Sequence, residues 1–106
     1  YSLITDIKEY IREHITEDIS LASVAQQFNI SAGYLSKFFK ENTDESFSKY
    51  MIEQKFTYAS EALIKFPNRS ITDIANELGY FDSAYFSRQF KAHYGVTPVQ
   101  YRKMNH

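Results

Sequence analysis

The sequence contains no cysteine, and its 106 residues include only three glycines and two prolines. The absence of cysteine excludes disulfides, thiolate nucleophiles and sulfur-ligated metals. No run approaches the roughly 20 apolar residues of a membrane span, and no charged start followed by an apolar stretch predicts a signal peptide. We therefore expect a soluble, cytoplasmic protein with no membrane partner. Because the chain begins with Tyr1 instead of Met, we also expect it to be part of a longer protein.

The chain also lacks an excess of positive charge. Lys and Arg number 12 against 13 Asp and Glu, whereas a basic surface is the usual mark of DNA binding. The acidic residues are concentrated at the start, since residues 1–18 hold five of them and only two basic residues. With 43% hydrophobic residues, the chain 1–106 can form one domain with a core of its own.

The sequence does contain an internal repeat. Residues 20–50 match residues 70–101 at an offset of 50 before a turn and 51 after it, so the second copy has one additional residue in its turn. Two copies of one unit indicate two subdomains, for which we expect the boundaries 1–46 and 67–106. The identical pairs are Ser20/Ser70, Ala25/Ala75, Tyr34/Tyr85, Ser36/Ser87, Phe39/Phe90, Lys40/Lys91 and Tyr50/Tyr101.

Each copy has the pattern of a helix, a turn and a second helix. A serine N-cap begins the first helix, and in the second copy Asp73 predicts a capping box with that serine. A small alanine lies four residues before a turn residue, Asn or Gly, that tolerates the left-handed conformation. A Ser or Asp then caps the second helix. In the two copies these residues are Ser20 and Ser70, Ala25 and Ala75, Asn29 and Gly79, and Ser31 and Asp82.

Three further helices complete the predicted fold. No Gly or Pro interrupts residues 47–66, which predicts one long linking helix. Thr97, Pro98 and Gln100 are suited to be the N-cap, the first residue and the capping-box partner of a short last helix. An apolar stripe predicts a first helix from Leu3, Ile7, Tyr10, Ile11 and Ile15. The fold class is therefore all-α, with seven helices and two helix-turn-helix subdomains joined by the linking helix in a homeodomain-like arrangement.

The second helix of each copy has one apolar side and one side of small and basic residues. The apolar side contains Leu35, Phe38 and Phe39 in the first copy, flanked by Tyr34, and Phe86 and Phe90 in the second. We interpret the rings of these helices, Tyr34 and Tyr85 included, as core or half-buried packing and not as base-stacking platforms. A helix whose outer side is small and basic fits the major groove of DNA. That side contains Gly33, Ser36, Lys37 and Lys40 in the first copy and Ala84, Ser87, Arg88 and Lys91 in the second.

The linking helix predicts the spacing of the two second helices. About 20 helical residues span roughly 30 Å, and one turn of B-DNA is about 34 Å. Two recognition helices on one chain could therefore enter successive major grooves of an asymmetric site, and a shortfall in spacing would favour bent DNA.

The stretch SITDIANELGYFDSAYFSRQFKAHYGVTPVQYR, residues 70–102, contains an Ile-Ala pair, Gly-Tyr, Tyr-Phe-Ser-Arg, Phe-Lys and Thr-Pro in one order. With these motifs the sequence resembles the DNA-binding domain of the AraC/XylS family of transcription regulators over nearly its whole length. The resemblance implies sequence-specific binding of double-stranded DNA by a bacterial-type regulator, with no enzymatic activity and no cofactor. It also implies an effector or dimerisation domain elsewhere in the protein, and it leaves the transcription machinery open as a second partner.

The resemblance implies a set of DNA contacts. The base-facing residues are Gly33, Ser36, Lys37, Ser83, Ala84, Ser87 and Arg88. Phosphate contacts are expected at the helix starts marked by Ser20 and Ser70 and at Lys55 of the linking helix. Lys40 and Lys91 are also expected to contact phosphate, because they lie nearer the helix ends. Arg88 can bind a guanine in bidentate fashion and Ala84 can touch a thymine methyl, whereas a serine hydroxyl discriminates poorly between bases. Ser36 and Ser87 therefore remain open between base contact and polar surface.

Three residues depart from the family pattern. Lys55 stands where Arg is common, which replaces a forked contact with a point charge. Asp44 stands where Gly is usual and where the second copy has Gly95, so we expect a less favourable end to the helix that precedes it. Ala62 is smaller than the apolar residue usual for the family, and Phe56 or Phe66 can fill the space.

Other classes of function find little support in the sequence. His14, His93 and His106 have no metal-ligand spacing, and we expect them in solvent or in packing. No glycine-rich phosphate loop and no set of Ser, His and Asp indicates an enzyme. The alternative that remains is a helical protein-interaction module of the same fold with weak or lost DNA affinity. The net charge of −1 supports this alternative. The two outer sides favour DNA, because we expect them to present Lys37, Lys40, Arg88 and Lys91 and no carboxylate.

Overall fold

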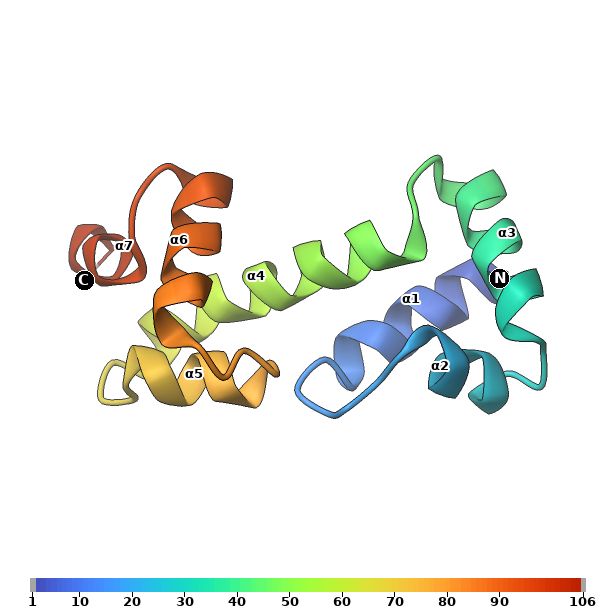
Figure 1. The fold of residues 1–106 in the computed structure, drawn as a ribbon, viewed down its shortest axis with the longest axis horizontal. Coiled ribbons are helices and arrows are strands. Elements are labelled where there is room, and N and C mark those ends of the chain that lie inside the picture. Colours follow the sequence, from blue (N-terminus) through green and yellow to red (C-terminus); the bar gives the residue numbers. More distant parts are fainter. Residues whose placement is uncertain (1, 106) are drawn as a thin grey trace. The chain divides into compact units, whose positions relative to one another are not determined.

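The computed structural model describes residues 2–105, so His106 lies outside the described residues. Over this range the chain forms seven α-helices and no strand (Figure 1), which confirms the predicted all-α class. The helices are α1 (Leu3–Glu13), α2 (Leu21–Gln27), α3 (Ala32–Thr43), α4 (Phe47–Lys65), α5 (Ile71–Glu77), α6 (Ser83–Tyr94) and α7 (Pro98–Met104).

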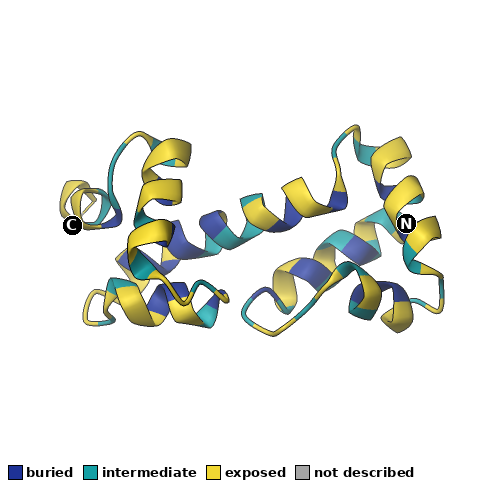
Figure 2. Ribbon diagram, viewed as in Figure 1, coloured by how far each residue is buried: buried dark blue, intermediate teal, exposed yellow. Residues whose placement is uncertain are grey.

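The chain packs as two compact units that meet inside α4, one ending at Gln54 and the other beginning at Lys55. Buried residues line both halves of α4 (Figure 2). Phe47 and Tyr50 belong to the core of the first unit, and Phe56 and Leu63 to that of the second. Each half of the linking helix therefore supplies part of a core, in addition to joining the two helix-turn-helix segments.

The core of the first unit forms around Phe39, whose fully buried ring lies 5.6 Å from that of Phe47 and 5.2 Å from that of Tyr50. Ile7 and Ile11 of the predicted stripe are also fully buried. The stripe was expected to extend the first helix to Ile15, but α1 ends at Glu13. Ile15 lies in the turn that follows α1, and its side chain is still buried. The last residue of the stripe therefore reaches the core from a turn and not from a further helical turn of α1.

The core of the second unit is an aromatic cluster. The Phe56 ring, from α4, lies 5.7 Å from Phe86, 6.3 Å from Phe90 and 5.9 Å from Tyr80. Phe86 and Phe90 are fully buried, as predicted for the apolar side of this helix. Because these rings belong to α4, α6 and the turn before α6, the cluster fixes the orientation of α6 within its unit.

The turns of the two copies have the same hydrogen-bond pattern. Asn29 and Gly79 have positive φ, 58° and 88°, as their residue types predicted. The backbone N–H of the following residue donates a hydrogen bond to the carbonyl of the buried alanine. The bond from Ile30 to Ala25 is 3.0 Å long, and the bond from Tyr80 to Ala75 is 2.9 Å long. This is a Schellman motif, which closes the first helix and aims the chain into the second.

The predicted N-caps are confirmed, with one difference. Each of the predicted caps accepts a backbone N–H, and Thr97 and Gln100 form the expected capping box. The box predicted at Ser70 is instead a single bond from the Asp73 N–H to the Ser70 hydroxyl at 3.0 Å, and the Asp73 side chain is exposed. The reciprocal pair of bonds is found in the first copy. There the Ser23 N–H donates to the Ser20 hydroxyl and the Ser20 N–H donates to the Ser23 hydroxyl.

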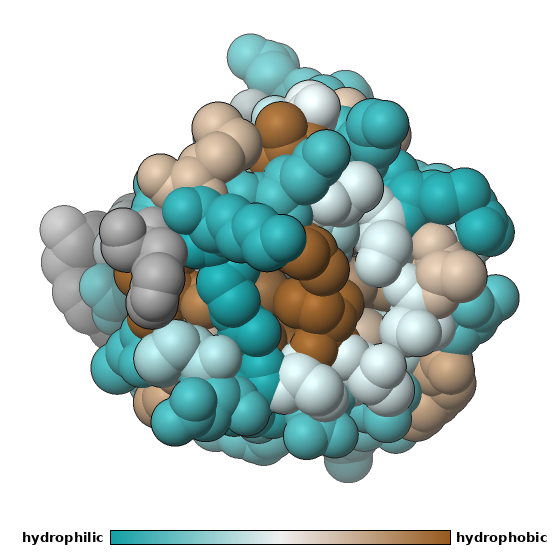
Figure 3. Space-filling model, turned by 90° about the vertical axis from the view of Figure 1, so that its left-hand side faces the viewer, coloured by the Kyte–Doolittle hydropathy of each residue, from teal (hydrophilic) through white to brown (hydrophobic). Residues whose placement is uncertain are grey.

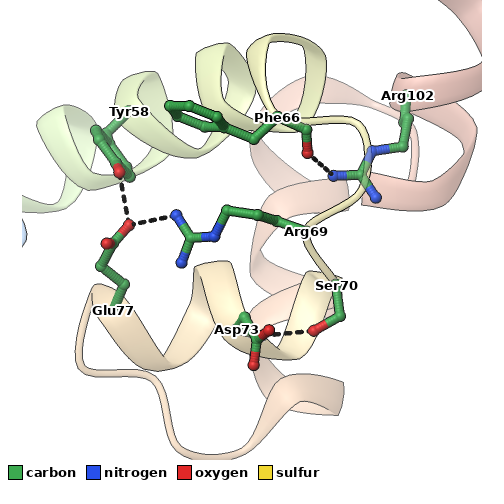
Figure 4. A network of polar contacts seen from close by, with 7 residues as sticks. All are labelled: Tyr58, Phe66, Arg69, Ser70, Asp73, Glu77 and Arg102. Atoms are coloured by element: carbon green, nitrogen blue, oxygen red, sulfur yellow. Dashed lines mark hydrogen bonds and ion pairs between the residues drawn. The ribbon is translucent and has the colours of Figure 1, made fainter.

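Polar side chains hold the second helix-turn-helix segment on α4 (Figure 4). Glu77, at the end of α5, accepts bonds from the Tyr58 hydroxyl at 2.5 Å and from Arg69 at 3.0 Å. Burial raises the pKa of the Glu77 carboxyl, but the two hydrogen bonds and the Arg69 charge outweigh it and hold that pKa below its usual value. Arg102, from α7, donates to the carbonyls of Leu63 and Phe66 at the end of α4. The network thus connects α5 and α7 to one helix.

The end of α3 in the first unit is a place where a single substitution is expected to raise stability. Asp44, after α3, has φ of 62°, and Gly95 occupies the same place after α6 with φ of 81°. A left-handed conformation costs most residues with a side chain about 1 to 2 kcal/mol, and a carboxylate at a helix C-terminus opposes the helix dipole. We expect Asp44→Gly to raise the free energy of unfolding by about 0.5 to 1.5 kcal/mol, measured by urea denaturation.

Asp44→Asn separates the two causes, because asparagine removes the charge and keeps a side chain that tolerates this conformation. A glycine variant no more stable than the wild type would show that Asp44 is unstrained. Equal gains from Asn and Gly would show that the additional backbone freedom of glycine contributes nothing at this position.

Candidate nucleic-acid interface

Each unit presents its second helix, α3 or α6, with two buried residues inward and a polar side outward. Leu35 and Phe39 are buried from α3, and Phe86 and Phe90 from α6. Of the residues predicted to face bases, five are exposed and two are half-buried. The exposed ones are Gly33, Ser36, Lys37, Ala84 and Arg88, and the half-buried ones are Ser83 and Ser87.

The residues predicted to contact phosphate lie at different kinds of position. Ser20 and Ser70 are exposed N-caps of α2 and α5. Lys40 and Lys91 are exposed in the last turns of α3 and α6. Lys55 is half-buried, with its ammonium nitrogen 5.5 Å from the centre of the Tyr80 ring. Lys55 therefore packs against the aromatic cluster of the second unit, a role that its sequence position did not indicate.

Two tyrosines interpreted as core or half-buried packing lie at the border of the core. Tyr34 is 52% exposed with its ring 5.8 Å from that of Phe38, and Tyr85 is 46% exposed with its ring 6.3 Å from that of Tyr80. Both rings are therefore half exposed, and neither belongs to the buried core. On a helical projection Tyr34 lies about 140° from Phe39, which is the signal in the sequence that places it away from the core. The Arg88 guanidinium carbon lies 5.9 Å from the centre of the Tyr85 ring. A cation over a ring is attracted to its face, so Tyr85 restricts the orientations of the Arg88 side chain.

The outer side of α3 also carries a carboxylate. Glu41 is exposed four residues after Lys37, and Ala92 occupies the same place on α6. The prediction that the outer sides hold no carboxylate is therefore wrong for α3, because Glu41 lies about 40° from Lys37 on a helical projection. The field over α3 is therefore less positive than the field over α6, although Lys and Arg stand at matching positions.

Charge differs between the two units more than it differs between the start of the chain and the rest. The first unit, up to Gln54, has five Lys and Arg against nine Asp and Glu. The second unit has seven against four. The net charge of −1 thus conceals an acidic unit and a basic one, and the basic surface typical of DNA-binding domains is concentrated in the unit that contains Arg88.

The histidines within residues 2–105 have partners of ordinary kinds. His14 Nδ1 lies 2.6 Å from the Glu17 carboxylate, and the His93 ring stacks on Phe56 at 5.5 Å. In this part of the chain no group of three or more His, Cys, Asp and Glu side chains is arranged to hold a metal ion. Nor does any of its helices combine the length and the hydropathy needed to cross a bilayer.

Comparison with known proteins gives matches over nearly the whole chain. The chain is 35% identical, over 97% of its length, to the uncharacterized HTH-type transcriptional regulator YfiF of Bacillus subtilis (strain 168), of which it covers 32%. It is 32% identical, over 94% of its length, to the regulatory protein SoxS of Salmonella typhimurium (strain LT2), of which it covers 92%. The chain spans about a third of the length of several other relatives.

Solved structures and a family pattern agree with these relatives. The C-terminal domain of AraT, a response regulator from Geobacillus stearothermophilus, matches with a TM-score of 0.84 and 33% identity, over 98% of this chain and 86% of that one. Residues 24–104 match a family described as a helix-turn-helix domain. The predicted resemblance is confirmed, and the chain belongs to the AraC-type helix-turn-helix family of transcription regulators.

Proposed function

We propose that this chain binds duplex DNA in a sequence-specific manner, with α3 and α6 as recognition helices. The observation that carries this function is the pair Lys37 and Arg88, which are exposed at matching positions of two helix-turn-helix copies. Membership of a family of transcription regulators supports the same function. The exposed basic residues stand beside small ones, Gly33 and Ala84, so that the helix backbone can approach the base edges closely.

The proposed base contacts follow from the chemistry of the outer sides. Arg88 reads a guanine with its forked guanidinium, and Lys37 is the corresponding donor of α3. Ala84 faces a thymine methyl, and Gly33 admits the duplex without a contact of its own. The serines add hydroxyls to the edges of the two surfaces: Ser36 from α3, and Ser83 and Ser87 from α6.

The proposed phosphate contacts position the protein and do not read sequence. Lys40 and Lys91 supply point charges near the helix ends, and the N-cap regions at Ser20 and Ser70 supply hydroxyls and amides. Lys55 contributes to the field of the basic second unit from its place against Tyr80. Since that unit has the excess of basic residues, we expect it to supply the greater part of the electrostatic attraction.

The continuous helix α4 supports a site of about one helical turn. Its 19 residues span about 28 Å, which is less than the turn of B-DNA, about 34 Å. We propose an asymmetric site with two unlike half-motifs in successive major grooves, because the outer residues of α3 and α6 differ.

The experiment that tests this function is selection of bound duplexes from a random pool, followed by titration of the selected site at several salt concentrations. We expect two different half-motifs about one helical turn apart, and an affinity that falls steeply with salt because neutralised phosphates release counterions. For the five proposed phosphate contacts the loss between 50 and 200 mM salt is about 500-fold. An interaction insensitive to salt, or no binding at low salt, would contradict DNA binding.

One observation favours the alternative of a protein-interaction module. The second unit exposes large apolar side chains on α4 and α7, among them Ile64, Val99 and Met104. Figure 3 shows apolar side chains in the middle of one face, surrounded by hydrophilic ones. Exposed apolar surface with a polar rim is typical of protein contacts. A selection experiment that returns no preferred duplex would favour this second function.

A further inference from the structure

The most exposed large apolar residue of the described chain is Phe81, at 85%. Phe81 stands in the turn between α5 and α6, directly before the N-cap Asp82. It is also the residue by which this turn is longer than the first one. In the first copy Ile30 is followed at once by the N-cap Ser31, whereas in the second copy Phe81 separates Tyr80 from Asp82.

A structural role for Phe81 is the first explanation to consider. An apolar residue directly before an N-cap often packs against the fourth residue of the helix, which here is Phe86. In this unit Tyr80 already fills that role, because its ring lies 5.4 Å from Phe86 and 5.9 Å from Phe56. The 85% exposure of Phe81 leaves its ring almost entirely in water, so the fold of the second unit does not account for a phenylalanine here.

The position of Phe81 relative to α6 is well defined. The Asp82 side chain accepts bonds from the Ala84 and Tyr85 amides at 3.0 and 3.1 Å, which ties the end of the turn to the start of the helix. Tyr80, on the other side of Phe81, is held by its bond to Ala75 and by the aromatic cluster. Phe81 is therefore presented from a turn anchored at both sides, three residues before Ala84.

Recognition helices of helix-turn-helix proteins contact base edges with their N-terminal residues. The entry of α6 is thus the part of the second unit that meets the major groove if the proposed function holds. In that groove the thymine 5-methyl is the group that offers an apolar side chain a base-specific contact. Ala84, the other apolar candidate on this surface, has a single methyl group, whereas the Phe81 ring can cover a thymine methyl more completely.

We propose that Phe81 is a specificity-determining residue whose ring packs on the 5-methyl group of a thymine at the edge of the half-site read by α6. This inference rests on the proposed function, since it requires α6 in the major groove. It assigns to the extra residue of the second turn a recognition role that the first copy lacks, and it makes the two half-sites differ in apolar as well as in polar contacts.

The test combines a protein variant with a modified duplex. With the selected site in hand, each thymine of the α6 half-site is replaced in turn by deoxyuridine, which removes only the methyl group. We expect one such replacement to weaken binding by the wild type about fourfold, the value of one buried methyl. The same replacement should leave binding by Phe81→Ser unchanged, while other thymines affect both proteins equally. Because Phe81 is exposed, the thermal unfolding of the variant should match that of the wild type.

Met104→Ser is the matched control, since Met104 is 70% exposed on α7 and its variant should keep the wild-type response to deoxyuridine. Two results overturn the inference and leave the proposed function intact. One is a wild type that binds its site but shows no thymine whose effect depends on Phe81. The other is a Phe81→Ser variant that weakens binding equally on every sequence, which would place the ring on the sugar-phosphate backbone. A wild type that selects no duplex at all overturns both.

Discussion

Replacing Phe86 with alanine is expected to lower the free energy of unfolding by about 3 to 5 kcal/mol. The Phe86 side chain is fully buried, and its ring contacts those of Phe56, Tyr80 and Phe90 at 5.7, 5.4 and 6.1 Å. Truncation removes the transfer free energy of the ring and leaves a cavity that three anchored rings cannot collapse to fill. Urea denaturation followed by circular dichroism measures the loss, and amide exchange of α6 shows whether it is confined to the second unit.

Tyr85→Ala is the neighbouring control for Phe86→Ala. Tyr85 is the preceding residue of the same helix and is 46% exposed, so alanine there changes helix propensity by a similar amount and creates no enclosed cavity. We expect its cost to be below about 1.5 kcal/mol. A Phe86→Ala variant that loses no more than Tyr85→Ala would show that the aromatic cluster is not the core of this unit.

The features predicted correctly from the sequence are those set by local rules. Asn29 and Gly79 adopt positive φ because few other residues tolerate it. Ser31 and Asp82 cap their helices because a short polar side chain satisfies free amides at that position. Both rules involve residues within three positions of one another, and each rule applies once in each copy of the internal repeat. The helix order therefore follows from the sequence without knowledge of the tertiary contacts.

The features that the sequence did not predict depend on contacts between distant residues. Glu77 accepts a hydrogen bond from Tyr58, 19 residues earlier, and no sequence motif indicates that pair. Lys55 lies over Tyr80 for the same reason. Tyr34 differs from these pairs, because its angle on the helix already places it away from Phe39. For this residue the structure adds only how much of the ring is exposed.

The sequence contains the difference in charge between the two units, but the difference is visible only when the residues are counted on each side of the boundary between the units. Counting from residue 18 isolates the acidic first helix, whereas the structure divides the chain inside α4. Only with this division does the second unit emerge as basic. The linking helix has no Gly, Pro or change in composition at Gln54, so nothing in the local sequence marks the point.

Removing the two strongest candidate base contacts together is expected to have the largest effect on DNA binding. Arg88→Ala and Lys37→Ala should each cost about 1 to 3 kcal/mol in binding free energy. Because they lie on different helices in different units, their costs should add, to about 2 to 6 kcal/mol in the double variant. Titration of the selected duplex at one fixed salt concentration measures all three variants, and their thermal unfolding should be unchanged because both side chains are exposed.

The sequence preference of each variant separates base reading from simple attraction. If Arg88 reads a base, Arg88→Ala relaxes the preference at one position of one half-motif, and Lys37→Ala relaxes a position of the other. Lys103→Ala, an exposed cation on α7, removes the same charge and should alter neither preference. A loss from Arg88→Ala that is equal on every duplex would reassign Arg88 to phosphate, because a lost phosphate contact weakens all sequences alike and lowers the slope of the salt dependence by about one. Tyr85 adds a second criterion: with Arg88 held against its ring, Tyr85→Leu should weaken the same base preference as Arg88→Ala and leave the other half-motif intact.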